Sequence, residues 1–279
     1  MAFVKFLAPA KINLFLRVLS QKNNGYHNLQ SIFQMVGLYD EIFIAPRADG
    51  KIIIENDNPS ILKEDDLCFK AAQLILDGTT LGVTIKVKKN IPVGAGLGGG
   101  SSDAATTLLA INQIYDLKIN KKKLMGIGLK LGADVPFFIN GKNGWVEGIG
   151  DRISPILIDN FRYILIIPDV SISTSSIFRD FKLTNKVIPL KITTSFSNEE
   201  HDNIGNDLID TIFKKHNRLH ELFLWLKEFG APKITGTGST LFIKSNDLNL
   251  AELIDKKRPK DTKIISVKGL SVHPHFLTD

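Results

Sequence analysis

The stretch Pro92-Val-Gly-Ala-Gly-Leu-Gly-Gly-Gly-Ser-Ser-Asp103 is the most specific part of this sequence, with glycines at 94, 96, 98, 99 and 100. A strand is predicted before it, over 83–89, and the apolar positions from Ser101 to Tyr115 recur with helical spacing. Glycines allow a backbone to approach a ligand closely, and the start of a helix offers unpaired N–H groups at the positive end of its dipole. The stretch therefore predicts a cradle for phosphate groups.

Two commoner phosphate-binding motifs fit this stretch poorly. A Walker A loop requires a Lys directly after its last glycine, where this chain has Ser101 and Ser102. A dinucleotide-binding fold requires a strand ending in Asp or Glu soon after the helix, but Lys121–Lys123 and another helical segment follow. The plainer alternative is a turn in which Ser101 or Ser102 caps the helix. We expect such capping as well, but it does not explain five glycines.

Outside this stretch the sequence predicts a mixture of strands and helices, which is typical of an α/β or α+β protein. The chain has 279 residues, nearly enough for two average domains. We expect a boundary near 155, which gives domains over 1–155 and 156–279. Further strands are predicted over 3–18, 42–45, 51–55, 163–167, 241–243 and 263–267, a strand and turn over 144–152, and helices over 66–76, 121–131, 206–215, 217–229 and 248–257.

The composition excludes several classes of protein. Hydrophobic residues make up 43% and charged residues 23%, which excludes a wholly disordered chain. With one cysteine, Cys68, the chain can form no intrachain disulfide and no cysteine-based zinc site, and a cytoplasmic location is favoured. No apolar run reaches the ~18 residues of a membrane span. His216 and His220 have helical spacing but lack a zinc-helix pattern, so a solvated helix face is favoured over a metal site.

Three polar residues stand in apolar surroundings. Over 3–18 the even positions are apolar, which predicts a strand with one buried face that Pro9 breaks or bulges. Lys11 and Asn13 share the other face, either exposed to solvent or contacting one substrate. Asp134 has only apolar or small neighbours, where a buried carboxylate is costly unless it is paired or used, although a turn or N-cap role is the alternative. A Lys paired with Asp134 would suit the activation of a hydroxyl.

Two further turns each allow a structural and a functional interpretation. Gly25-Tyr26-His27 is either a turn with a partly buried Tyr or a platform on which a nucleobase stacks beside a hydrogen-bonding His. Thr235-Gly-Thr-Gly-Ser-Thr240 is either an ordinary loop or a second backbone cradle that closes over phosphates.

Taken together, these segments resemble the GHMP kinase superfamily. The resemblance implies a two-domain fold, with a first half like domain 2 of ribosomal protein S5 and a ferredoxin-like second half. It implies that ATP binds in the first half and the substrate in the cleft between the halves. The segments that carry it are Pro9–Leu14, Gly25–His27, Pro92–Ala104, Gly132–Phe137, Gly205–Leu208 and Gly236–Ser239.

Within the superfamily, the first two segments point to a kinase whose substrate carries a cytidine diphosphate. The resemblance implies ATP-dependent phosphorylation of the 2-hydroxyl of a methylated sugar alcohol bearing that group, a step toward isoprenoid precursors. Asp134 would accept the hydroxyl proton and contact the substrate, and Lys11 would orient Asp134 and stabilise developing charge. Mg²⁺ would be held mainly by the phosphates of ATP, so no all-protein metal site is expected.

The resemblance also implies a set of binding residues. Asn13 would place the sugar alcohol, Tyr26 and Phe178 would sandwich the cytosine, and His27 would read its edge. Thr174 would lie near the substrate, and Gly236, Thr237, Gly238 and Ser239 would form the second phosphate loop. ATP would be bound by Asp66, Pro92, Gly94, Gly96, Leu97, Gly98, Gly99, Gly100, Ser101 and Ser102. The chain departs from the usual pattern at Ser173 and Ser175, where Pro is common, and at Thr237, where Ser is usual.

Two other functions stay open at this point. A homoserine or mevalonate type of kinase shares the glycine stretch but would not prefer a cytidine-bearing substrate. A non-enzymatic RNA-binding module is suggested by the sequence pI of 9.2 and the S5-like half. The basic runs Lys121–Lys123 and Lys256–Lys260 are short and more typical of solvated helix ends, so we expect neither a nucleic-acid nor a membrane partner, and no oligomeric state is predicted.

Overall fold

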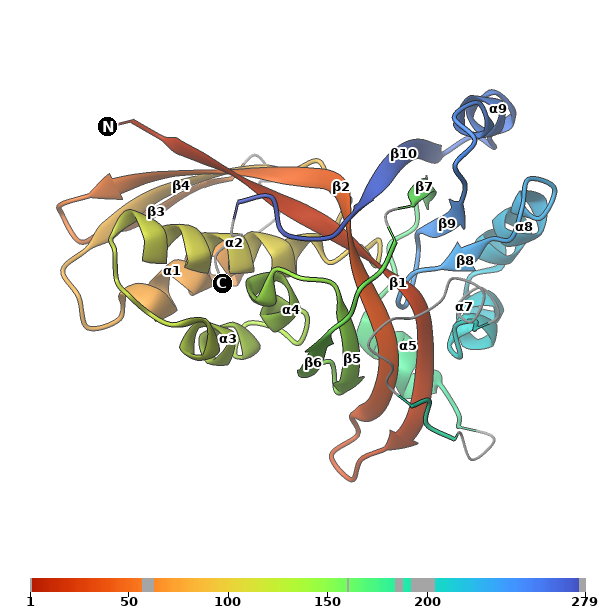
Figure 1. Cartoon of the computed structure of the whole chain (residues 1–279), viewed down its shortest axis with the longest axis horizontal. Helices are drawn as coiled ribbons and strands as arrows, with labels where there is room; N and C mark the ends of the chain where they lie inside the picture. Colours follow the sequence, from red (N-terminus) through yellow and green to blue (C-terminus); the bar gives the residue numbers. More distant parts are fainter. Residues whose placement is uncertain (1, 57–62, 160, 184–187, 192–203, 276–279) are drawn as a thin grey trace.

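Two long antiparallel strands, β1 (Val4–Gln21) and β2 (His27–Arg47), run through the molecule from one half to the other (Figure 1). The computed structural model describes residues 2–56, 63–159, 161–183, 188–191 and 204–275. The register of β1 against β2 shifts between Pro9 and Ala10, which confirms the predicted bulge, while the strand continues through it. These two strands form the frame on which both halves are built.

The described strands form one sheet, in the order β3-β4-β2-β10-β7-β9-β8, with β1 beside β2 and with β5 and β6 continuing from β2. Only 42–45 of β2 was predicted. Within β2 the run Gln30–Val36 is buried without interruption, and such a run lacks clean polar–apolar alternation. The other strands are β3 (Ile52–Asn56), β4 (Gly82–Lys88), β5 (Gly144–Gly148), β6 (Arg152–Pro155), β7 (Arg162–Pro168), β8 (Lys233–Ile234), β9 (Leu241–Lys244) and β10 (Thr262–Leu270).

Helices cover the two halves separately. In Figure 1, α1 to α4 lie together on one side of the first-half strands, whereas α7, α8 and α9 gather at the other end of the molecule. The predicted mixed α+β fold is confirmed, and the six predicted helices are present with small shifts at their ends. The helices are α1 (Leu67–Leu76), α2 (Gly99–Ile114), α3 (Lys121–Leu129), α4 (Val135–Asn140), α5 (Thr174–Asp180), α7 (Ile209–Lys215), α8 (Asn217–Leu226) and α9 (Leu250–Lys257), with a 3-10 turn η1 (Lys63–Asp65) before α1.

The start of α2 differs from the prediction. The helix begins at Gly99, and its N-cap is Gly98, whose φ of +71° lies in the left-handed region. Because Gly98 has no side chain, no side-chain hydrogen bond caps the helix. Ser101 and Ser102 are therefore inside the helix, so the prediction that one of them caps it is wrong. A left-handed glycine turns the chain into the helix without a capping side chain, and the first N–H groups stay available to a ligand.

The face of β1 that carries Lys11 and Asn13 is not a solvent face. Lys11 is 4% exposed and Asn13 2% exposed. Lys11 N donates to the Leu97 carbonyl (2.9 Å), and Asn13 N donates to Thr235 Oγ1 (3.0 Å). Both glycine-containing loops therefore pack on this part of β1 and bury its polar face.

The strand β10 connects the halves from the far end of the described chain. It pairs with β7 over seven residues and then with β2, where Gly269 lies opposite Val36 and Leu270 opposite Met35. Beyond it, His273 N donates to the Gly141 carbonyl (2.8 Å), so the chain returns to the first half. Within the described residues, no helix is long and apolar enough to cross a membrane.

Candidate active site

A cavity of about 790 Å³ opens between the glycine stretch, β1 and the start of α4. It is lined by most of the residues that the sequence singled out, from both halves of the chain. Ser102, Tyr26, His27, Gly238 and Ser239 are not among its lining residues. Those that line it are Lys11, Asn13, Asp66, Pro92, Gly94, Gly96, Leu97, Gly98, Gly99, Gly100, Ser101, Asp134, Thr174, Phe178, Gly236 and Thr237.

The glycine stretch curves tightly into α2. Gly94, Gly96 and Gly98 have φ between +71° and +75°, a region that side chains disfavour. A Cβ on Gly96 would lie 2.7 Å from the carbonyl oxygens of Thr235 and Gly238, and one on Gly98 would lie 3.0 Å from Lys11 Cγ. The first loop is thus pressed against the second loop and against Lys11. The two serines separate, because Ser101 lines the cavity whereas Ser102 is wholly buried in the helix.

Lys11 and Asp134 meet on the cavity wall. Lys11 Nζ lies 3.4 Å from Asp134 Oδ2, donates to Asn13 Oδ1 at 2.7 Å, and stands 4.6 Å from the centre of the Phe33 ring. Asp134 occupies the N-cap position of α4 but makes no side-chain cap bond. Its side chain is 29% exposed, so it is less buried than its neighbours in the sequence suggest and its carboxylate is accessible from the cavity.

Asn13 is fixed by a hydrogen-bond network. Its Nδ2 donates to Ser31 Oγ (2.9 Å), and its Oδ1 accepts from Lys11 and from Thr235 Oγ1 (3.3 Å). Thr235 is fully buried and also lies within hydrogen-bond distance of the Gly96 carbonyl (3.2 Å). The network ties β1, the glycine stretch and the 235–237 loop to one another at the Lys11 end of the cavity.

Two of the three aromatic residues expected at the cytosine pack on each other. The His27 ring packs on Phe178, with 5.3 Å between their centres, and edge-on against Phe181 at 6.0 Å. Burial lowers the pKa of His27, which favours the neutral imidazole at neutral pH. Tyr26 is 60% exposed in the turn before β2. Phe178 lines the cavity, His27 packs on Phe178, and Tyr26 is exposed to solvent.

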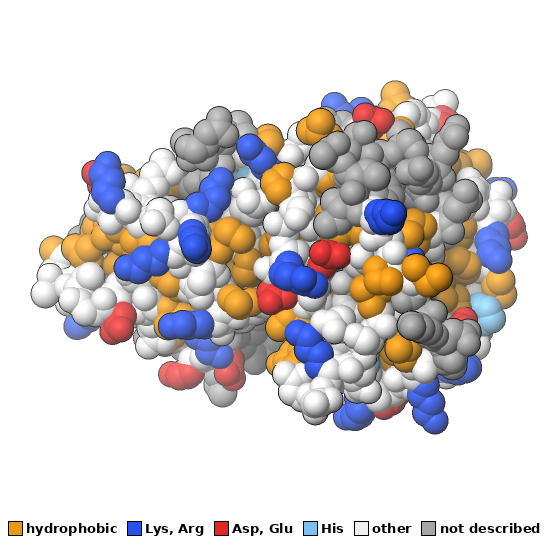
Figure 2. All heavy atoms as spheres, turned by 60° about the horizontal axis from the view of Figure 1, so that its bottom comes forward, with side chains coloured by type: hydrophobic (Ala, Val, Ile, Leu, Met, Phe, Trp, Pro, Cys, Tyr) orange, Lys and Arg blue, Asp and Glu red, His pale blue; other side chains and the backbone are white. Residues whose placement is uncertain are grey.

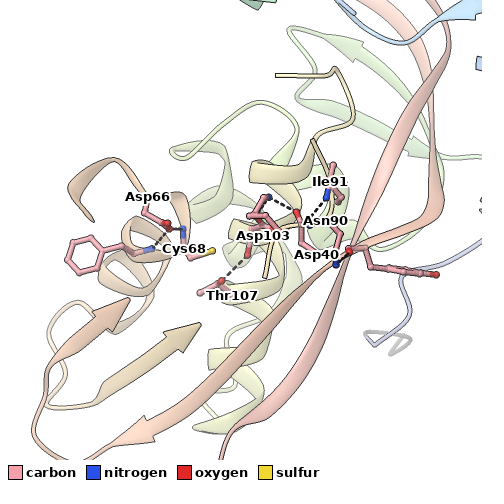
Figure 3. Close-up of polar contacts among 10 residues, drawn as sticks. Asp40, Asp66, Cys68, Asn90, Ile91, Asp103 and Thr107 are labelled. Carbon is pink, nitrogen blue, oxygen red and sulfur yellow. Dashed lines mark hydrogen bonds and ion pairs between the residues drawn. The ribbon is translucent and has the colours of Figure 1, made fainter. Parts of the chain in front are cut away.

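A buried charge cluster that borders the cavity through Lys89 and Asp103 was missed by sequence reasoning. Lys89, just after β4, forms ion pairs with Asp40 of β2 and Asp103 of α2. Asp40 also accepts from Asn90 N and from Ile91 N (2.8 Å), as Figure 3 shows. These residues are far apart in sequence and belong to no local motif, so no sequence signal could have brought them together.

The cluster holds one more carboxylate than ammonium groups. Burial raises the pKa of Asp103 to about 8, and the charge of Asp40 adds to this effect while Lys89 opposes it. Burial lowers the pKa of Lys89, but the two carboxylates outweigh that effect and raise it overall. Asp103 Oδ1 has no hydrogen-bond partner among the described residues. Burial, together with the neighbouring Asp40, therefore favours the protonated form of Asp103.

Asp66, which also lines the cavity, has a structural role. It is the N-cap of α1, and its Oδ1 accepts from the N–H groups of Cys68 (2.8 Å) and Phe69 (3.2 Å), as Figure 3 shows. Cys68 is buried beside Asp103 and also lines the cavity, and burial raises the pKa of its thiol. Asp66 thus orients the start of α1 against the cavity.

The described residues contain no group of three or more His, Cys, Asp or Glu side chains that could hold a metal ion. On the face shown in Figure 2, Lys and Arg side chains are spread singly among acidic and uncharged ones.

Comparison with known proteins gives concordant results. Residues 66–142 match the family described as "GHMP kinases N terminal domain". The chain is 39% identical over 272 residues to 4-diphosphocytidyl-2-C-methyl-D-erythritol kinase of Ralstonia pickettii (strain 12J), covering 96% of this chain and 94% of the relative. It is 38% identical over 285 residues to the kinase of the same name from Acinetobacter baylyi, covering 99% of each.

Solved structures agree with these relatives. A crystal structure of 4-(cytidine 5'-diphospho)-2C-methyl-D-erythritol kinase superimposes with a TM-score of 0.83 at 28% identity, covering 95% of this chain and 99% of that chain. The mevalonate kinase of Methanococcus jannaschii superimposes with a TM-score of 0.69 at 16% identity, covering 96% and 99%. The second likeness shows a shared fold only.

Proposed function

The chain belongs to the 4-diphosphocytidyl-2-C-methyl-D-erythritol kinases, phosphotransferases of the GHMP kinase superfamily, and from this we propose that it transfers the γ-phosphoryl group of ATP to the 2-hydroxyl of 4-diphosphocytidyl-2-C-methyl-D-erythritol. Its place is then in the non-mevalonate synthesis of isoprenoid precursors. The observation that carries the proposal is the Lys11–Asp134 pair, 3.4 Å apart, on the wall of a cavity that the glycine stretch also lines.

The pair suits proton removal from a hydroxyl. Asp134 makes no cap bond, so its carboxylate is available to accept the proton as the hydroxyl oxygen attacks the γ-phosphorus. Lys11 lies beside that carboxylate, holds its orientation and supplies a positive charge where negative charge develops. Phosphoryl transfer depends mostly on positioning and charge stabilisation, so these two groups and a phosphate cradle supply its main requirements.

ATP is assigned to the glycine stretch. The backbone N–H groups at the start of α2 and the positive end of the helix dipole would bind its phosphates, and the hydroxyl of Ser101 adds a donor on the same wall. Its base would extend toward the end of the cavity lined by Asp66, Leu67 and Lys89. Ser102 has no part in this assignment, because it is wholly buried.

Mg²⁺ fits the oxygen donors of this cavity. The hydroxyl of Ser101 and the carboxylate of Asp134 both line it, and such an ion is held by one or two protein oxygens together with waters and nucleotide phosphates. When bound, the ion would offset part of the charge on the phosphates. The chain itself contributes the cradle that holds the nucleotide and the Lys11 ammonium.

The substrate is assigned to the side of the cavity where Asn13, Thr174 and Phe178 lie. Asn13 would hydrogen-bond the methylerythritol part, and Phe178 offers a ring face to the cytosine. Tyr26 would cover the other face of the base, and neutral His27 would orient Phe178 and reach the edge of the base. We accordingly assign nucleotide binding to residues 1–155 and a contribution to the substrate side to residues 156–279.

The test is a substrate panel. Purified protein with ATP and Mg²⁺ should release ADP with 4-diphosphocytidyl-2-C-methyl-D-erythritol, and should release far less with homoserine or mevalonate. Phosphorus NMR of the product should show a new phosphomonoester at the 2-position. ADP release that is independent of the cytidine substrate would contradict the proposal, and salt-sensitive RNA binding without turnover would favour the binding-module hypothesis.

A further inference from the structure

The segment Gly205-Asn206-Asp207-Leu208 does not line the cavity, but it is hydrogen-bonded to β1. Leu16 N donates to the Gly205 carbonyl (3.2 Å), and Asp207 N donates to the Leu16 carbonyl (2.9 Å). The carboxylate of Asp207 accepts from Val18 N (2.9 Å). The segment is thus fixed to the same strand that carries Lys11 and Asn13.

From this anchor, Asn206 reaches across to the second glycine loop. Its Nδ2 donates to the carbonyls of Gly236 (2.7 Å) and Ile234 (3.2 Å), and its Oδ1 accepts from Leu208 N (2.9 Å). The side chain is 7% exposed, so both amide hydrogens and the oxygen are engaged inside the protein. Asn206 therefore sets the direction of the Gly236 carbonyl.

The direction of the Gly236 carbonyl also fixes the direction of the Thr237 N–H group. The peptide bond between Gly236 and Thr237 is trans, so its C=O and N–H point in opposite directions. The carbonyl points to Asn206, and the Thr237 N–H therefore points away from it. Both residues line the cavity, and within the described part of the chain this N–H has no acceptor.

Gly236, the residue before this N–H, lies close to Asn13 and Lys11. A Cβ on Gly236 would be 3.3 Å from Asn13 Oδ1 and 3.9 Å from Lys11 Nζ. The Thr237 side chain is turned to Thr174, with 3.0 Å between the two hydroxyl oxygens, so the backbone rather than the hydroxyl is what it offers to the cavity. An unpaired backbone N–H on a peptide whose preceding residue adjoins an ammonium group suits an anionic oxygen.

We propose that Asn206 is a positioning residue that orients the Gly236–Thr237 peptide, so that the Thr237 N–H binds an oxygen of the phosphoryl group being transferred. The inference rests on the proposed phosphoryl transfer. A donor that contacts this group in the transition state raises kcat more than it lowers KM.

The kinetic test uses Asn206→Ala and Asn206→Asp. Asn206→Ala should lower kcat by ~100-fold, with both KM values changing by less than ~3-fold. At pH 8, Asn206→Asp should have a kcat as low as that of Asn206→Ala. Its carboxylate cannot donate to the Gly236 and Ile234 carbonyl oxygens and would repel them. It should recover relative to Asn206→Ala as the pH falls toward 5.5, because a protonated carboxyl donates one hydrogen bond.

Asn217→Asp is the matched control. Asn217 is at the start of α8 and donates to Glu221 on the surface, so this change should leave kcat and its pH profile unaltered. A merely structural role for Asn206 predicts lower thermal stability with a constant ratio of the kcat values of the two variants across pH. That outcome would overturn the proposal. So would an Asn206→Ala variant whose only kinetic change is a higher KM for the cytidine substrate.

A second measurement does not depend on turnover. With ¹⁵N-threonine labelling, the Thr237 amide resonance, identified by its loss in Thr237→Ser, should shift when inorganic pyrophosphate is added to the wild-type protein. The shift should be absent in Asn206→Ala. No response in the wild type rules out the N–H as a phosphate ligand even if a variant fails to fold. A clear response in a protein without kinase activity would refute the proposed function and leave the orientation by Asn206 standing.

Discussion

Lys11 Nζ lies 3.4 Å from Asp134 Oδ2, and only the lysine of this pair is buried. The Lys11 side chain is 5% exposed and the Asp134 side chain 29% exposed. The ammonium group is thus held inside the protein by Asn13 and Asp134, while the carboxylate remains accessible to a ligand. This asymmetry is what a proton acceptor oriented by a fixed cation requires.

Asp134→Asn should therefore remove most turnover. The amide keeps the shape of the carboxylate but cannot accept the hydroxyl proton, so kcat should fall by ~10²–10⁴-fold. The KM for ATP should change little, because the glycine stretch is untouched. Steady-state assays with Asp255→Asn, an exposed change on α9, serve as the control. Turnover within threefold of wild type would show that Asp134 is not the base.

Gly96→Ala should weaken both folding and ATP binding. A side chain at φ +75° costs ~1–2 kcal/mol, and its Cβ would lie 2.7 Å from two backbone carbonyl oxygens of the second loop. Together these effects should lower the free energy of unfolding by ~3 kcal/mol and raise the KM for ATP. Urea unfolding and ATP titration measure the two effects.

Gly126→Ala is the matched glycine change. Gly126 lies inside α3, and a Cβ there would meet nothing within 4 Å. Alanine has the higher helix propensity, so this variant should gain ~1 kcal/mol without a change in ATP binding. If Gly96→Ala were as stable as Gly126→Ala, the tight packing of the two loops would not hold in solution.

Tyr26→Ala should affect only the cytidine substrate. Tyr26 is 60% exposed, so the protein should lose little stability without it. Removing one base-stacking ring costs ~1–3 kcal/mol, which corresponds to a KM for the cytidine substrate raised ~5–150-fold with the KM for ATP unchanged. Tyr26→Phe keeps the ring and should behave like wild type. Equal KM values for Tyr26→Ala and Tyr26→Phe would remove the stacking role.

Asp103 makes stability depend on pH. Its pKa is about 8 in the folded protein and ~3.9 for an unperturbed Asp, so between these values the folded state retains a proton that the unfolded state has lost. The free energy of unfolding should therefore fall as pH rises from 5 to 8, by at most ~1.4 kcal/mol per pH unit. Asp103→Asn resembles the protonated form and should lack this contribution.

Urea unfolding of both proteins at pH 5 and pH 8 measures the effect. Lys89 and Asp40 are common to the two proteins, so the difference in stability between them isolates Asp103. The wild type should lose stability relative to Asp103→Asn at the higher pH. A difference that stays constant across this range would mean that Asp103 is ionised throughout.

Local signals in the sequence predicted much of the site. The glycine stretch predicted a cradle that enters a helix, and the pairing of Asp134 with a Lys was inferred from the cost of an isolated carboxylate. The helix start was misplaced by two residues, because Ser is a common N-cap and a left-handed glycine is a rarer alternative.

What the sequence did not predict depends on contacts between distant segments. Lys11 and Asn13 alternate with apolar residues as on a half-exposed strand, and only the two loops that fold over β1 bury them. The cluster of Asp40, Lys89 and Asp103 draws on three separate elements. The middle of β2, Gln30–Val36, was missed because a strand segment buried on both faces shows no alternation.

The pairing of β10 with β2 bears on how a nascent chain acquires this structure. Met35 and Val36 are synthesised early, but the strand that covers their edge, at Gly269 and Leu270, emerges from the ribosome more than two hundred residues later. Until then this part of β2 offers an open edge to other chains. Nascent chains that still lack β10 should thus be the species most prone to aggregate, and the first half should gain full protection from proteolysis only once β10 has paired with β2.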